Sequence, residues 1–169
     1  MKKLSYLLSA GVLVAMLAVV GCKKDDGGGI TPEDAAGANF AGTWAVSAAS
    51  GAVIYDGSGG SDDRTDAYSS FALNITYAAG QGSGTYVATD GQENASPWPE
   101  NGTWKFTNDT PPASADNFSI ERLGDGLVVG VLISGDNMTL TFNFQDGTHT
   151  GNGRVEAVSG DWTFNLVKQ

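Results

Sequence analysis

The stretch Met138-Thr-Leu-Thr-Phe-Asn-Phe144 decides the fold class, because apolar and polar residues alternate along it without a break. Successive side chains of an extended strand point to opposite faces, so this alternation places one apolar face against a core. The same period of two recurs from Phe40 onward, in runs rich in aromatic and β-branched residues. Dipeptides such as Asp125-Gly126 separate the runs and supply the positive φ that tight hairpins need.

The alternating runs predict about eight strands joined by short connections. They span residues 42–49, 68–77, 83–89, 102–107, 117–123, 127–134, 138–145 and 153–168. Short connections favour an antiparallel meander, and a meander of this size closes into a barrel or splits into a sandwich. We therefore predict an all-β fold, a small antiparallel up-and-down β-barrel. A β-sandwich is the alternative, because both architectures bury the same faces.

Composition and charge exclude several classes of protein. The 169 residues include 9 Lys and Arg against 19 Asp and Glu, which gives a net charge of −10. A nucleic-acid binder needs a basic face to replace the counterions on phosphate, so we expect no nucleic-acid partner. A single Cys and a single His provide neither a disulfide framework nor a Cys/His zinc site.

The N-terminus has the layout of a secretory signal. Lys2 and Lys3 precede an apolar run over residues 4–20, and Gly21 follows it. The short basic flank and the small residue at the end indicate a signal peptide over residues 1–21 rather than a permanent membrane helix.

The residues around Cys22 resemble those of bacterial lipoproteins. Val-Val-Gly-Cys22 is similar to a lipobox, and Lys-Lys-Asp-Asp over residues 23–26 resembles the surface-export signal of Bacteroidota lipoproteins. The resemblance implies cleavage before Cys22, acylation of Cys22 with chains such as palmitate, and an outer-membrane anchor with the domain facing the cell exterior. Several acyl chains are needed for stable anchoring, because one chain binds a membrane only marginally.

The segment after Cys22 has the composition of a linker. It contains three consecutive Gly, a Pro and one isolated Ile, and such residues cannot bury a core. We predict a lipidated flexible tether over residues 22–39 and a β-barrel domain over residues 40–169.

A short motif, Gly-x-Trp, recurs within three of the predicted strands. Its three copies are Gly42-Thr-Trp44, Gly102-Thr-Trp104 and Gly160-Asp-Trp162. With these motifs the chain resembles the lipocalin-like families, including lipocalin-like outer-membrane lipoproteins of Bacteroidota. The resemblance implies a calycin-like barrel that is closed by Trp44 and Trp162, with an Arg of the last strand across the Trp. Arg154 is the best match to that Arg, and Arg122 is the second.

The sequence contains no set of residues typical of catalysis, and we expect neither an enzyme nor a cofactor. His149, the single His, lies in a turn-rich segment, where a solvated side chain is the ordinary role. The acidic segment 56–66 has oxygen ligands at alternating positions, as a calcium site does, but lacks the spacing of an EF-hand. A calcium site and a solvated acidic loop both remain open, and we assign no metal ligand.

Three functions follow from these patterns. The first is binding of a small apolar or amphipathic ligand in the barrel or at its mouth. The second is glycan binding by Trp98, which stands between two prolines and either stacks on a sugar as an exposed ring or covers the barrel mouth as a lid. The third is a structural role in which strand 127–133, apolar on both faces, binds a protein partner. The candidate ligand-binding residues are Trp44, Trp98, Trp104, Phe142 and Phe164.

Overall fold

The computed structural model describes residues 29–89, 96–107, 112, 114–145, 148–151, 154–157 and 159–169. These residues form one α-helix, one 3-10 helix and twelve strands. In chain order the elements are α1 (Pro32–Phe40), β1 (Gly42–Val46), β2 (Val53–Gly57), β3 (Gly60–Asp63), η1 (Asp66–Tyr68), β4 (Ala72–Ile75), β5 (Ser83–Thr89), β6 (Asn101–Phe106), β7 (Asn117–Arg122), β8 (Val128–Ser134), β9 (Asn137–Phe144), β10 (Thr148–Gly151), β11 (Arg154–Ala157) and β12 (Gly160–Lys168).

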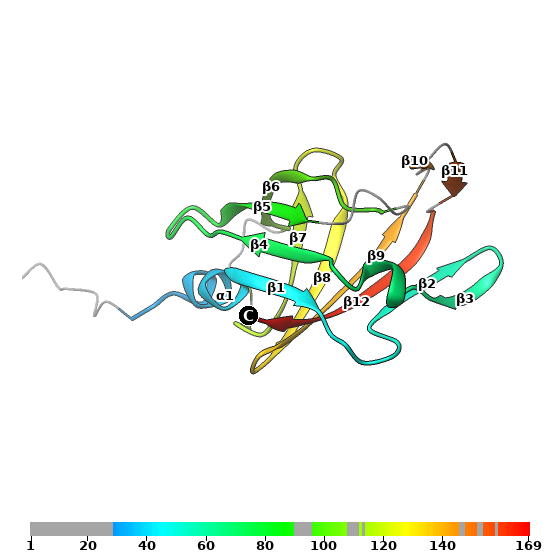
Figure 1. The fold of residues 1–169 in the computed structure, drawn as a ribbon. Coiled ribbons are helices and arrows are strands. Elements are labelled where there is room, and N and C mark those ends of the chain that lie inside the picture. Colours follow the sequence, from blue (N-terminus) through cyan, green and yellow to red (C-terminus); the bar gives the residue numbers. More distant parts are fainter. Residues whose placement is uncertain are drawn as a thin grey trace, which may run out of the picture.

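Eight of these strands form a closed antiparallel barrel, as the sequence predicts (Figure 1). The strands follow the order β1-β4-β5-β6-β7-β8-β9-β12, and β12 returns to pair with β1. Trp44 stands opposite Lys168 in this closing pair, and Val46 stands opposite Leu166. Because the first and last strands pair, the sheet has no break on that side and the sandwich alternative is wrong.

Strand β12 also carries a hairpin that the sequence analysis did not predict. Its first half pairs with β2, with Trp162 opposite Tyr55, and β2 pairs in turn with β3. The hairpin extends past the barrel wall, near one end of β12 (Figure 1). The segment 56–66 is therefore partly a hairpin. The predicted strand 153–168 is wrong in its first part, because β11 pairs with β10 in a separate two-stranded sheet and β12 begins at Gly160.

Helix α1 lies in the segment for which we predict a flexible tether, so that prediction is wrong for residues 32–39. The Thr31 hydroxyl accepts a hydrogen bond from the Asp34 amide at 3.0 Å, and Pro32 stands in the first turn, as at many helix starts. Phe40 is the single large apolar side chain among the nine residues, so no helical stripe marks the segment in the sequence.

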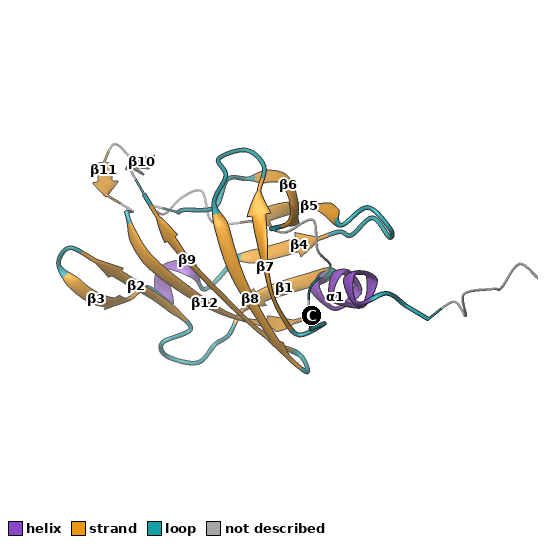
Figure 2. Cartoon of the chain, turned by 180° about the vertical axis from the view of Figure 1, so that it is seen from behind, coloured by secondary structure: helices purple, strands orange, loops and turns teal. Residues whose placement is uncertain are grey.

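Contacts with the barrel hold α1 across the end where β1 begins and β4 ends (Figure 2). The Asp34 carboxylate accepts a hydrogen bond from the Tyr77 hydroxyl at 2.7 Å. Gly37 lies directly against the Tyr77 ring, since an added Cβ would come within 2.4 Å of it. The Phe40 ring packs edge-on against Trp104, with the ring centroids 5.0 Å apart. The helix therefore covers one end of the barrel.

The core follows the period of two that the sequence shows. In β9, Met138, Leu140 and Phe142 are buried, whereas Thr141 and Asn143 on the other face are exposed. The barrel wall thus has an apolar inner face and a mainly polar outer face. Across the described ranges, no helix combines the length and the apolar character that crossing a membrane requires.

Candidate functional site

Trp44 is fully buried near the end of the barrel that α1 covers. Its indole Nε1 donates a hydrogen bond to the Phe40 carbonyl oxygen at 2.9 Å. The cation across its ring is Lys168 from the last strand, with Nζ 5.1 Å from the ring centroid. The resemblance implied Arg154 in this place, but Arg154 begins β11 outside the barrel sheet, and its side chain lies outside the described residues.

The glycine of each Gly-x-Trp motif lies on the same face of its strand as the Trp two residues later. Because it has no side chain, an atom of an adjacent strand can approach it closely. A Cβ at Gly42 would come within 2.9 Å of Lys168 Cε, and one at Gly102 within 2.6 Å of the Tyr86 hydroxyl oxygen. At Gly160 it would lie 2.4 Å from a backbone carbonyl oxygen of β2. Each motif thus pairs a large Trp ring with a glycine against which a side chain or the backbone of an adjacent strand packs.

The candidate ligand-binding residues Trp104, Phe142 and Phe164 pack against other aromatic rings inside the barrel. Trp104 is fully buried, and its ring centroid lies 5.4 Å from that of Phe106. Phe142 and Phe164 stack at 6.0 Å, and Trp162 stacks on Phe164 at 5.8 Å. These rings belong to the core of the barrel. A ligand at their position would have to displace them.

Trp98 is only 3% exposed, so the prediction of an exposed sugar-stacking ring is wrong. The ring lies edge-on to Phe142 at 5.6 Å, at the barrel end opposite α1. The Arg122 guanidinium carbon lies 5.1 Å from the Trp98 ring centroid, and Nη1 donates to the Pro97 carbonyl oxygen at 2.7 Å. The described part of the loop before β6, residues 96–100, thus places the Trp98 ring over the mouth of the barrel, as the lid alternative expected.

The Arg122 guanidinium pairs with a carboxylate that the sequence analysis did not single out. Arg122 is 1% exposed, and its Nε donates to Asp125 Oδ1 at 3.2 Å while Nη2 donates to Asp125 Oδ2. Partial burial raises the pKa of Asp125, but the hydrogen bonds and the charge of Arg122 outweigh that effect and hold the pKa below its usual value. Asp125 therefore stays ionised at neutral pH.

A hollow of about 510 Å³ lies beside this ion pair, where the β7–β8 turn meets the end of β9. Apolar and polar side chains both line it, and Phe144 is half-buried within it, 6.0 Å from the Arg122 guanidinium carbon. We call this hollow the rim pocket. Its lining residues are Asp125, Gly126, Leu127, Val128, Asn143, Phe144 and Gln145.

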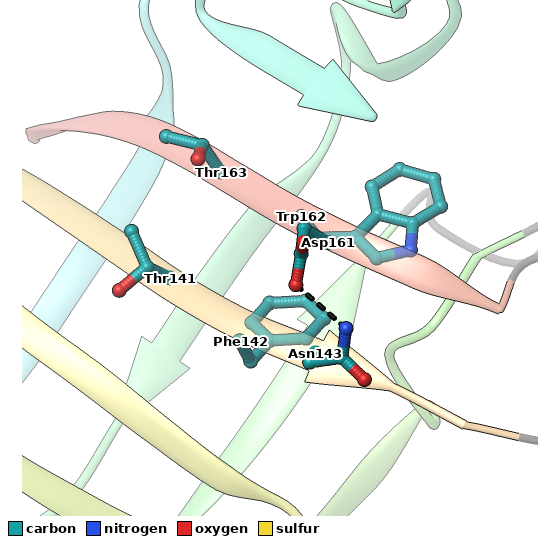
Figure 3. Close-up of a pocket in the computed structure, with 6 residues that line it drawn as sticks. All are labelled: Thr141, Phe142, Asn143, Asp161, Trp162 and Thr163. Carbon is teal, nitrogen blue, oxygen red and sulfur yellow. Dashed lines mark hydrogen bonds between the residues drawn. The ribbon is translucent and has the colours of Figure 1, made fainter. Parts of the chain in front are cut away.

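A second hollow, of about 310 Å³, lies over the outer wall of β9 and β12 (Figure 3). Thr141, Thr163 and Asn143 surround it, and the Asn143 amide donates to Asp161 Oδ1 at 2.6 Å. Phe142 and Trp162 contribute little exposed surface to it, because both side chains are buried in the core.

A third hollow, of about 400 Å³, lies beside Asp63. The Asp63 carboxylate accepts hydrogen bonds from Thr65 Oγ1 at 2.6 Å, the Thr65 amide at 2.9 Å, the Gly51 amide at 3.0 Å and Ser50 Oγ at 3.1 Å. The bonds from Thr65 chiefly lower the pKa of Asp63. Within the described ranges, no three His, Cys, Asp or Glu side chains lie where they would hold a metal ion together. The structure therefore gives no support to calcium in segment 56–66.

Strand β8 is apolar on both faces, as the sequence shows. Val129, Val131 and Ile133 are buried, whereas Val128 and Leu132 on the outer face are 53% and 52% exposed. Gly130 stands between the two exposed side chains. The partner surface at residues 127–133 stays a prediction.

The signal peptide, Cys22 and the side chain of His149 lie outside the described residues. No protein-family model matches the chain, and no curated protein or solved structure has significant similarity to it.

Proposed function

We propose that this protein is a lipid-anchored β-barrel that binds a small amphipathic molecule in the rim pocket. The observation that supports this function is the mixed lining of the pocket. Leu127, Val128 and Phe144 form an apolar wall, and Asp125 and the Asn143 amide stand beside it. The volume of about 510 Å³ falls within the roughly 300–1,000 Å³ of typical small-molecule sites.

The packing of the core favours the rim over the barrel centre. Trp44 and Trp104 are fully buried, and Phe142 stacks on Phe164. Displacing these rings would remove several kcal/mol of packing, because truncating a large aromatic core residue costs about 3–5 kcal/mol. A ligand in the rim pocket needs no such displacement.

A matched pair of substitutions on β8 tests this proposal. Val128 lines the rim pocket, whereas Leu132 lies on the same face of the same strand, is equally exposed, and does not line it. We expect Val128→Asn to weaken binding of a neutral amphiphile, 1-octanol, about fivefold, because about 1 kcal/mol of apolar contact is lost. Leu132→Asn should leave the affinity unchanged. Equal effects of both substitutions in calorimetric titrations would contradict the proposal.

We propose the outer membrane as the location, with the domain outside the cell, on the resemblance of the segment around Cys22. In cells given an alkynyl palmitate analogue, the wild-type chain should become labelled and the Cys22→Ala variant should not. Protease added to intact cells should remove the domain of the wild-type protein. Equal labelling of both chains would contradict the lipid anchor, and protection from protease would contradict the outward orientation.

Binding of a protein partner on β8 is a second candidate function. The half-exposed Val128 and Leu132 support it, because two large apolar side chains on one strand face outward. A photo-crosslinking residue at position 132 tests this function in cells. A discrete crosslinked species that disappears with Gly130→Arg is the expected result, and the absence of any crosslink would contradict it.

A further inference from the structure

We propose that the rim pocket selects cationic amphiphiles, in which an amine nitrogen lies at the Asp125 carboxylate and an apolar body lies on Leu127, Val128 and Phe144. This inference rests on the proposed function and adds the charge of the ligand to it. Three features of the pocket point to a cation.

The first feature is the orientation of the ion pair. Arg122 is 1% exposed, whereas the Asp125 side chain is 37% exposed and lines the pocket. The guanidinium is therefore buried, and the pair presents its negative end to a bound molecule. The carboxylate keeps free acceptor capacity, because two oxygens provide about four lone-pair sites and three protein hydrogen bonds occupy part of them.

The second feature is the lack of a free cation that could pair with an anion. The seven lining residues include no Lys, Arg or His. The nearby Arg122 directs Nε and Nη2 to Asp125 and Nη1 to the Pro97 carbonyl oxygen. The Asn143 and Gln145 amides each use one N–H within the protein, toward Asp161 and Asn143, and as neutral groups they offer an anion no compensating charge. Among the described residues of the pocket, a fatty-acid carboxylate would thus meet a carboxylate without a free cation beside it.

The third feature is the half-buried Phe144 ring, whose face attracts a positive charge. The Arg122 guanidinium carbon already lies 6.0 Å from its centroid, so a ligand amine would share the ring with that cation. The net charge of −10 acts in the same direction, because it raises the local concentration of cations and lowers that of anions. Aromatic face, carboxylate and apolar wall together match an alkyl or aryl amine.

Three eight-carbon probes with the same chain test the inference: octylammonium, 1-octanol and octanoate. Each is titrated into the full-length chain at pH 7, and amide chemical shifts of Gly126, Val128 and Gln145 report binding in the rim pocket. We expect octylammonium to bind about fivefold more tightly than 1-octanol and octanoate to bind most weakly. Equal affinity of ammonium and alcohol, or tighter binding of octanoate, overturns the inference and leaves the proposed function standing. If none of the probes shifts these amides, the proposed function fails as well.

A pair of charge-removing variants separates the pocket from the general field. Asp125→Asn should abolish the preference for octylammonium over 1-octanol, whereas Asp136→Asn, in the exposed turn at the other end of the barrel, should retain it. Loss of the preference in both variants would show that net charge alone causes it, and would overturn the inference.

The salt dependence of the wild-type preference is a second test, because Asp125→Asn removes the partner of a buried guanidinium and can impair folding. Raising NaCl from about 0.05 M to about 0.5 M shortens the Debye length from roughly 14 Å to roughly 4 Å. The ratio of the two affinities should then fall at least twofold. A ratio that does not change with salt overturns the inference.

Discussion

The two members of the Arg122–Asp125 ion pair should contribute unequally to stability. We expect removal of the more exposed Asp125 to destabilise the fold more than removal of the buried Arg122. In Asp125→Ala, the guanidinium stays in a site where it is 1% exposed and has lost its carboxylate. In Arg122→Met, the remaining carboxylate is 37% exposed, so water can solvate it. An unpaired charge costs more where water cannot reach it.

The magnitudes follow from the same geometry. Breaking a fully buried ion pair by removing one partner costs about 3–5 kcal/mol, and the partial exposure of Asp125 lowers the expected loss for Asp125→Ala to about 2–4 kcal/mol. Arg122→Met removes the bond to the Pro97 carbonyl oxygen and the contact with the Trp98 ring, but it keeps an apolar stem in the site. We expect it to cost about 1–2 kcal/mol.

Equilibrium unfolding in urea at pH 7, followed by tryptophan fluorescence and far-UV circular dichroism, measures both losses. Asp136→Ala, in an exposed turn, is the control and should change the free energy of unfolding by less than about 0.5 kcal/mol. The reasoning would be refuted if Arg122→Met lost as much stability as Asp125→Ala, or more.

The same variants predict a pH dependence. The pKa of Asp125 is lower in the folded than in the unfolded chain, so its contribution to stability is present above a pH of about 4 and is lost as the pH falls further. The gap between wild type and Asp125→Ala should therefore shrink when unfolding is measured at a pH of about 3. A gap of constant size would contradict this assignment.

Two further predictions concern the barrel ends. Gly160→Ala should lower the free energy of unfolding by about 1–3 kcal/mol, because the new Cβ would meet a backbone carbonyl oxygen of β2. The control is Gly59→Ala, which should be nearly neutral because no atom lies within 4 Å of the new Cβ. Equal urea midpoints of the two variants would contradict the close approach at Gly160. Burial and the bond to Asp34 raise the pKa of Tyr77 to about 12, so its stabilising contribution is complete below a pH of about 10 and is lost as the pH rises toward 12. In absorbance titrations at 295 nm, the Tyr77 phenol should ionise at a lower pH in Asp34→Asn than in the wild type. An unchanged titration curve would exclude an effect of Asp34 on the pKa of Tyr77.

The strands of the barrel could be predicted from the sequence because the alternation of apolar and polar residues in each strand shows which of its faces is buried. Met138, Leu140 and Phe142 alternate with polar residues along β9, and the burial in the structure follows that alternation. Closure could not be predicted in this way, since the pairing of Trp44 with Lys168 joins strands from opposite ends of the chain. Helix α1 lacked an apolar stripe, and its tertiary contacts define it.

The candidate site was harder to predict, because its parts are ordinary by themselves. Asp125 lies in a dipeptide typical of a turn, and Phe144 ends an alternating strand. The rim pocket exists because the barrel brings the β7–β8 turn beside the end of β9. Trp98 shows the opposite difficulty: the flanking prolines indicate a loop correctly, but they do not show whether its ring points to water or into the barrel mouth.

The most direct test of the central claim is the map of amide and indole chemical shifts when 1-octanol is added to the wild-type protein. Binding at the rim predicts shifts that are largest in residues 125–128 and 143–145, with the indole signals of Trp44 and Trp104 unchanged. Shifts that are largest at those two indoles would place the ligand in the barrel interior and contradict a site at the rim.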